Sequence, residues 1–107
     1  MRSKTTRKHI EFISEHLPVE ERLCALAEEA SELAQAALKL RRVYDQTSPT
    51  VTPYKEVIDN LYEEIADVNV CVRALGLDSK HHVKIYQEKA AYKLQRWVER
   101  ISKRAGN

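Results

Sequence analysis

The sequence predicts an all-helical protein built as one domain. Its 107 residues are enough for a single hydrophobic core and too few for two. Only two glycines and three prolines are present, and alanine, leucine, glutamate, lysine and arginine are abundant. Four segments carry apolar residues at the spacing of a helical face. These observations together predict an all-α four-helix bundle that occupies residues 1 to 107.

The first helix is expected over residues 5 to 17, where Ile10, Ile13 and Leu17 share a face. A second helix should begin at Pro18, because proline suits the first helical turn, and should end at about Val43. Six apolar residues of the second helix fall within about 100° of arc and form its predicted buried stripe. They are Leu23, Leu26, Ala30, Leu33, Ala37 and Leu40.

A loop and a third helix follow. Residues 45 to 53, DQTSPTVTP, are the one shift in composition and predict the loop. Thr52 and Pro53 are suited to the start of the third helix, and Gly76 to its end, because glycine adopts the left-handed C-terminal turn. The predicted apolar stripe of this helix consists of Val57, Leu61, Ile65, Val68, Val72 and Leu75.

A fourth helix should begin after a cap at Asp78 or Ser79 and reach about Lys103. Its predicted stripe consists of Val83, Tyr86, Ala90, Leu94, Trp97 and Ile101. We expect the two aromatic rings in the core, with stacking on a nucleobase as the alternative. One flank of the stripe is basic throughout. It consists of Lys89, Lys93, Arg96 and Arg100.

Carboxylates occupy positions where a core is expected. Glu64 falls inside the stripe of the third helix and Asp67 lies on its flank, while Glu29 and Glu32 form an acidic edge beside the second stripe. An unpaired carboxylate on a core-facing surface must be protonated, paired with a cation or bound to metal. If the two helices are antiparallel, the four side chains can converge, and such oxygen ligands suit Mg²⁺ or Mn²⁺. Solvated surface is the alternative, and periodicity alone leaves both readings open.

The two acidic stretches, LAEEASELAQAALKLRR and NLYEEIADVNVCVRAL, resemble those of the MazG-like all-α nucleoside triphosphate pyrophosphatases. The pattern of that family is Glu-Glu-x-x-Glu followed by Glu-x-x-Asp on paired helices. The resemblance covers roughly residues 19 to 101. It implies hydrolysis of a nucleoside triphosphate to the monophosphate and pyrophosphate, with the bundle completed in a homodimer or a larger homo-oligomer. The biological role that it suggests is housecleaning of the nucleotide pool.

The resemblance also implies roles for individual residues. The metal ligands carry over onto Glu29, Glu32, Glu64 and Asp67, which would hold Mg²⁺, with Mn²⁺ as a substitute. Glu28 matches the first glutamate of the motif and either supports the metal ligands, activates a water, or is an exposed helix residue. Lys93 and Arg100 match cations that contact the triphosphate. Arg96 lies between them and is either a further phosphate contact or part of a solvated flank. An asparagine often found between the two cations is Trp97 here, so the resemblance does not define the base and sugar contacts.

Charge and cysteine content limit which partners and which cellular compartment are expected. A net charge of +2 gives little support to nucleic-acid binding, and no apolar stretch approaches the length of a membrane span. Cys24 and Cys71 are expected as free, buried thiols of a cytoplasmic protein. Two alternatives to an enzyme stay open. One is a non-enzymatic helical interaction module with paired acidic and basic flanks, and the other is a nucleic-acid-binding protein that uses the basic stripe of residues 89 to 100.

Overall fold

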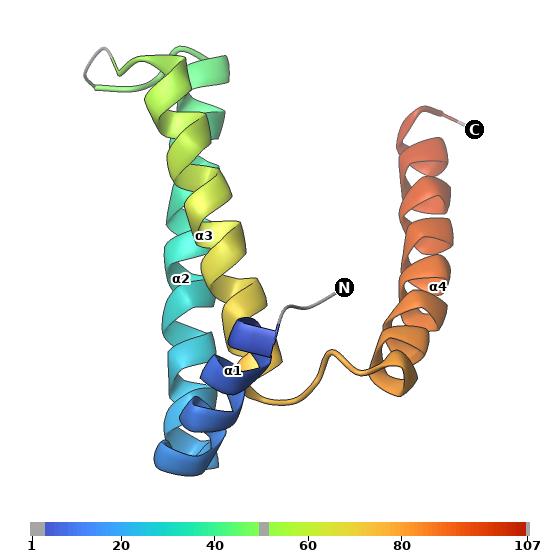
Figure 1. Cartoon of the computed structure of the whole chain (residues 1–107). Coiled ribbons are helices and arrows are strands. Elements are labelled where there is room, and N and C mark those ends of the chain that lie inside the picture. The colour runs from blue at the N-terminus through green and yellow to red at the C-terminus, as the bar shows by residue number, and fades with distance from the viewer. Residues whose placement is uncertain (1–3, 50–51, 107) are drawn as a thin grey trace. The chain divides into compact units, whose positions relative to one another are not determined.

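A computed structural model describes residues 4 to 49 and 52 to 106. This part of the chain is helical and contains no strand, which confirms the predicted all-α class. No helix in it is long and apolar enough to cross a bilayer. The chain divides into two compact units, Met1–Gly76 and Leu77–Asn107, which are described separately. Its helices are α1 (Lys4–His16), α2 (Val19–Tyr44), α3 (Tyr54–Ala74) and α4 (Lys80–Arg104), as Figure 1 shows.

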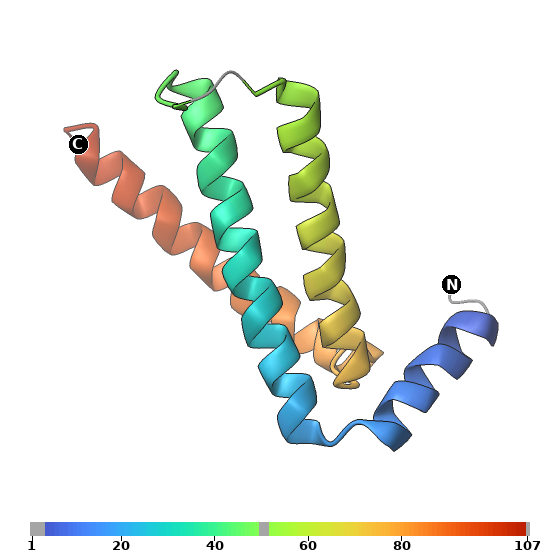
Figure 2. The same cartoon turned by 90° about the vertical axis from the view of Figure 1, so that its left-hand side faces the viewer.

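The first unit is built on a hairpin in which α2 and α3 lie side by side and run antiparallel (Figures 1 and 2). Along each helix, one series of buried and half-buried residues recurs at alternating spacings of four and three. This is the 3.5-residue repeat of two helices packed along a shared seam. The seam residues of α2 are Arg22, Leu26, Glu29, Leu33, Ala36, Leu40 and Val43, and those of α3 are Val57, Leu61, Glu64, Val68, Cys71 and Leu75.

The predicted stripes are therefore only partly right. In α2, Leu23 is 51% exposed, and Ala30 and Ala37 are exposed as well, so the packed face is rotated away from these residues. In α3 the deviation is confined to Ile65, which is 42% exposed. Ala36 is 2% exposed, whereas Ala37, which the predicted stripe contains, is exposed. The packed face of α2 is thus rotated, relative to the predicted stripe, toward the side of the helix that carries Glu29.

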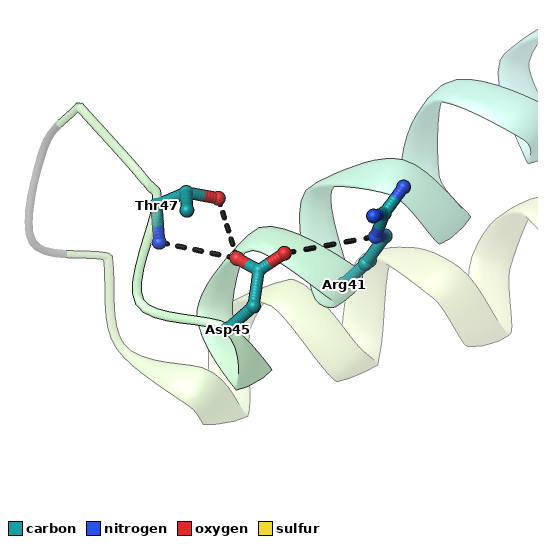
Figure 3. Close-up of polar contacts among 3 residues, drawn as sticks. All are labelled: Arg41, Asp45 and Thr47. Carbon is teal, nitrogen blue, oxygen red and sulfur yellow. Dashed lines mark hydrogen bonds and ion pairs between the residues drawn. The ribbon is translucent and has the colours of Figure 1, made fainter.

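α2 ends at Tyr44 and α3 begins at Tyr54, so the described parts of the loop between them, residues 45 to 49 and 52 to 53, lie where the sequence predicts. Its first turn is held by Asp45, one of whose carboxylate oxygens accepts hydrogen bonds from the backbone N–H and the hydroxyl of Thr47 (Figure 3). The other oxygen lies 3.6 Å from Nε of Arg41. These bonds, with that of the Thr47 hydroxyl foremost, lower the pKa of Asp45. Gln46, between the two, adopts a left-handed conformation with φ of 60°.

Arg22 joins three parts of the first unit. Its guanidinium donates one hydrogen bond to the carbonyl oxygen of Leu17 at 2.9 Å and another to that of Ala74 at 2.8 Å. The Ser14 hydroxyl of α1 donates to the same Ala74 carbonyl at 3.5 Å. One side chain of α2 therefore ties the end of α1 to the last turn of α3. The three predicted apolar residues of the first helix are half-buried on this side; they are Ile10, Ile13 and Leu17.

The second unit consists of α4 and the segment that leads into it. Ser79 caps the helix, since its hydroxyl accepts a hydrogen bond from the backbone N–H of His82 at 3.4 Å. The Tyr86 hydroxyl donates to the carbonyl oxygen of Leu77 at 2.8 Å and anchors the leading segment. Within this unit α4 buries none of its residues, and Trp97 is 61% exposed. The expected core position of Tyr86 and Trp97 is thus not found in this unit by itself, because a single helix has no second face to cover the stripe.

The two cysteines differ from the prediction. Both are free, as expected, but Cys24 is exposed and Cys71 only half-buried. Cys24 lies on the outer side of α2, well away in angle from the seam residue Leu26. Cys71 is itself a seam residue of α3. Their expected burial is therefore wrong for Cys24 and incomplete for Cys71.

Candidate metal centre

The candidate site begins with two glutamates that occupy seam positions. Glu29 stands between Leu26 and Leu33 in the seam of α2, and Glu64 between Leu61 and Val68 in the seam of α3. All six side chains are half-buried. The sequence pattern predicts this position for Glu64, whereas it places Glu29 only at the border of its stripe. In both helices a carboxylate thus replaces an aliphatic side chain where the helices meet.

The antiparallel pairing brings three predicted ligands together. Carboxylate oxygens of Glu29, Glu64 and Asp67 all lie within 4.8 Å of one another. The Oε2 atoms of Glu29 and Glu64 are buried, and neither has a hydrogen-bond partner among the described residues. Buried polar atoms in proteins are nearly always paired. A bound cation or a shared proton would therefore give these two atoms the partner that they lack.

The close approach of these carboxylates changes their pKa values. Burial raises the pKa of Glu29, and the negative charges of Glu32, Asp67 and Glu64 raise it further. Burial likewise raises the pKa of Glu64, followed by the charges of Glu32 and Asp67. Glu32 is exposed and stands outside the group of three, but it lies close enough to affect both glutamates. The four predicted ligands thus form one electrostatic cluster, which is called the carboxylate cluster below.

The donor set fits a hard divalent cation. Mg²⁺ and Mn²⁺ prefer carboxylate oxygens, and a dication would partner both Oε2 atoms and offset the mutual repulsion. The neighbouring thiol does not compete. Burial, and then the charges of Glu29 and Asp67, raise the pKa of Cys71 above its usual value of 9.0, so the thiol stays protonated near neutral pH. The cluster therefore offers oxygen ligands.

The other predicted site residues lie outside the cluster. Glu28 is exposed on α2, next to Glu29. Lys93, Arg96 and Arg100 are exposed on α4 in the second unit, where the guanidinium carbon of Arg96 lies 5.8 Å from the ring centroid of Tyr92. Their contacts with a substrate stay predictions. So does the water-activating role of Glu28.

The structure also contains a pocket that the sequence does not predict. It measures about 360 Å³ and lies at the loop end of the hairpin. Its sequence signal is weak, since Lys39 and Arg42 stand near the C-terminus of α2, where basic residues are common because they complement the helix dipole. The lining residues are Lys39, Arg42, Val43, Ser48, Pro49, Thr52, Glu56, Val57 and Asn60. This hollow is called the loop-end pocket below.

Comparison of the chain with known protein families, with curated proteins and with solved structures found no significant match.

Proposed function

We propose that the protein hydrolyses nucleoside triphosphates, deoxynucleotides included, to the monophosphate and pyrophosphate in a Mg²⁺-dependent reaction. One observation carries the proposal: oxygens of Glu29, Glu64 and Asp67 lie within 4.8 Å of one another across two helices. A second observation supports it. The buried Oε2 atoms of Glu29 and Glu64 have no hydrogen-bond partner among the described residues, and a bound cation would provide one. Paired carboxylates of this kind are suited to hold divalent cations against phosphate oxygens. The resemblance of both acidic motifs to the MazG-like pyrophosphatases supplies the reaction.

Each part of the chain has a role in this proposal. Glu29, Glu32, Glu64 and Asp67 would hold the ion. When bound, Mg²⁺ would neutralise phosphate charge and lower the pKa of a coordinated water near the α-phosphorus. Glu28 is the carboxylate that we expect to orient this water. The cations of α4, which are Lys93, Arg96 and Arg100, would stabilise negative charge on the departing pyrophosphate.

A second copy of the chain completes the protein in this proposal. The first unit buries Ala36, Val57 and Ala74, all small residues, and α4 buries none within its own unit. Helices with this little buried surface gain stability from further packing, and a symmetric homodimer is the commonest way to obtain it. Sedimentation velocity tests this point, because a monomer at micromolar concentration would contradict it.

A pyrophosphate-release assay tests the proposed reaction. The substrates are a panel of canonical and modified deoxynucleoside triphosphates with Mg²⁺, and the variant is Asp67→Asn. The matched control is Asp59→Asn, which changes an exposed aspartate of the same helix outside the carboxylate cluster. We expect wild type and control to release pyrophosphate and Asp67→Asn to lose most of its activity. Release of orthophosphate would contradict attack at the α-phosphorus, and no turnover on any nucleotide would favour the helical interaction module.

A further inference from the structure

The loop-end pocket has an apolar floor and a polar rim. Val57 is buried, and Val43, Thr52 and Asn60 are half-buried around it. The volume of about 360 Å³ is in the range of pockets that hold small molecules. Hydroxyl groups of the loop and the amide of Asn60 supply hydrogen-bonding atoms near this floor. The hollow is therefore built to receive a small polar ligand.

The charges around the pocket favour an anion. Lys39 and Arg42 line one wall from α2, one helical turn apart, and both are exposed. Neither forms an ion pair within the described residues, although the charge of Arg42, like that of Arg41, lowers the pKa of Asp45. Glu56 on the wall from α3 is the one carboxylate in the lining, so the cations outnumber it. By contrast, the neighbouring Arg41 is paired with Asp45 and does not line the pocket (Figure 3).

The helix ends at the pocket add to the positive potential. The first turn of α3 borders it through Glu56 and Val57, and no side-chain hydrogen bond from a described residue caps this N-terminus. The N–H groups of Glu56 and Val57 donate to the Pro53 carbonyl oxygen, so the contribution of this turn to anion binding is the positive end of the helix dipole. At the opposing C-terminus of α2, the last carbonyl groups are hydrogen-bonded. Its Arg41 and Arg42 carbonyls accept hydrogen bonds from the N–H groups of Asp45 and Thr47.

The pocket lies on the same face of the hairpin as the carboxylate cluster. Lys39 follows Glu32 by seven residues, and Asn60 precedes Asp67 by seven, which in a helix means the same side and about 10 Å along the axis. An extended nucleotide is long enough to reach from one to the other. The cluster would therefore hold one part of such a molecule and the pocket another.

We propose that the loop-end pocket binds a phosphate group, with Lys39 and Arg42 as its cationic contacts. Two sources share this chemistry. One is free inorganic phosphate or pyrophosphate, and the other is the terminal phosphate of a nucleotide whose remainder lies at the carboxylate cluster. The second source rests on the proposed function. Binding of the free anions does not.

The test is titration of the full chain with pyrophosphate and with inorganic phosphate in EDTA, followed by backbone amide NMR and calorimetry. Without divalent cations the carboxylate cluster repels these anions, and residue-resolved NMR shifts distinguish binding at the pocket from binding at the cations of α4. We expect shifts at the first turn of α3 and an affinity that falls about tenfold in Arg42→Ala or Lys39→Ala. Arg41→Ala, which removes the same charge one residue away, should leave the affinity nearly unchanged. Glu56→Gln should raise it.

Equal losses in Arg41→Ala and Arg42→Ala would overturn the proposal, because the effect would then be one of net charge alone. Shifts confined to α4 would overturn it too. A non-hydrolysable nucleoside triphosphate analogue with Mg²⁺ separates the two sources. If Arg42→Ala weakens this analogue as much as pyrophosphate, the pocket holds the terminal phosphate; if it weakens only the free anions, the pocket is a site for inorganic phosphate. Failure of the hydrolysis assay would leave the EDTA result intact, so the two proposals fail separately.

Discussion

Glu29 and Glu64 face each other across the seam of α2 and α3, with carboxylate oxygens within 4.8 Å. One oxygen of each is buried without a hydrogen-bond partner among the described residues. Burial raises the pKa of both groups, and the negative charges of Glu32 and Asp67 raise both pKa values further. Two positions that would stabilise a helical hairpin with leucine or valine are therefore occupied by side chains that weaken it while ionised and unpaired.

The first prediction concerns metal binding and stability. Mg²⁺ or Mn²⁺ should raise the melting temperature by about 5 °C or more at saturation, because the ion binds the folded chain and not the unfolded one. Glu64→Gln should abolish this rise and leave metal-free stability equal or higher. The control is Glu63→Gln, which changes an exposed neighbour and should keep the full metal effect. Undiminished stabilisation of Glu64→Gln by metal would show that the ion binds elsewhere.

The second prediction concerns pH in the absence of metal. Because the folded-state pKa values of Glu29 and Glu64 lie above the usual 4.5, the folded chain binds more protons than the unfolded chain just above that pH. The stabilising contribution of these groups is therefore complete below about pH 4.5 and is lost as the pH rises through their folded-state pKa values. Thermal unfolding in EDTA, compared between wild type and Glu29→Gln/Glu64→Gln, should show the variant gaining relative stability toward neutral pH. A difference that stays constant from pH 4 to 7 would contradict the raised pKa values.

Most helix boundaries could be predicted to within a residue or two because their signals are local. However, Pro18 and Pro53 are the N-cap residues of α2 and α3 instead of their first helical residues, and Thr52 does not cap α3. Gly76 has the positive φ of 72° that its place after α3 requires, and Ser79 is the cap of α4. The packed face of α2 could not be fixed in this way. Alanines stand on several of its sides, so periodicity does not distinguish Ala36 from Ala37, and only pairing with α3 decides between them.

The residues of the candidate site could likewise be predicted only in part. Glu64 could be predicted because a single carboxylate inside a run of aliphatic positions is conspicuous. The seam position of Glu29 depends on the register of two helices, which one sequence pattern does not contain. The loop-end pocket could not be predicted from the sequence. Its walls come from α2, α3 and the loop, and no short motif joins Lys39 to Asn60.

A third prediction tests the assigned roles of the cations on α4. Lys93→Ala and Arg100→Ala should each lower kcat/KM for triphosphate hydrolysis by about a hundredfold, because each removes a charge that stabilises the departing pyrophosphate. The matched control is Lys84→Ala, which removes an exposed lysine from the opposite flank of the same helix. Equal effects of all three substitutions would point to overall charge in place of specific contacts.

A fourth prediction concerns the cysteines. Cys24 is exposed, whereas the half-buried Cys71 has a pKa raised by burial and by the charges of Glu29 and Asp67. Because the thiolate is the reactive form, iodoacetamide at pH 7.5 should modify Cys24 well before Cys71. Mass spectrometry of timed samples measures this order. Faster labelling of Cys71 in Cys24→Ser than of Cys24 in Cys71→Ser would contradict the described environments.

The last prediction concerns the Arg22 junction. Arg22→Ala should lower the free energy of unfolding by about 2 kcal/mol, because it leaves the carbonyls of Leu17 and Ala74 without the guanidinium that bonds both. Arg22→Lys should recover only part of this loss, since one ammonium group cannot reproduce two bonds from a planar fork. Urea unfolding measures both variants, with Arg73→Ala, an exposed arginine of α3, as the control. Because Arg22 lies seven residues, about two helical turns, from Glu29, metal affinity should change little in Arg22→Lys. A large loss of metal affinity in this variant would contradict this expectation. It would mean that the Arg22 junction sets the register of Glu29 against Glu64, and that the regular repeat of the seam does not fix this register by itself.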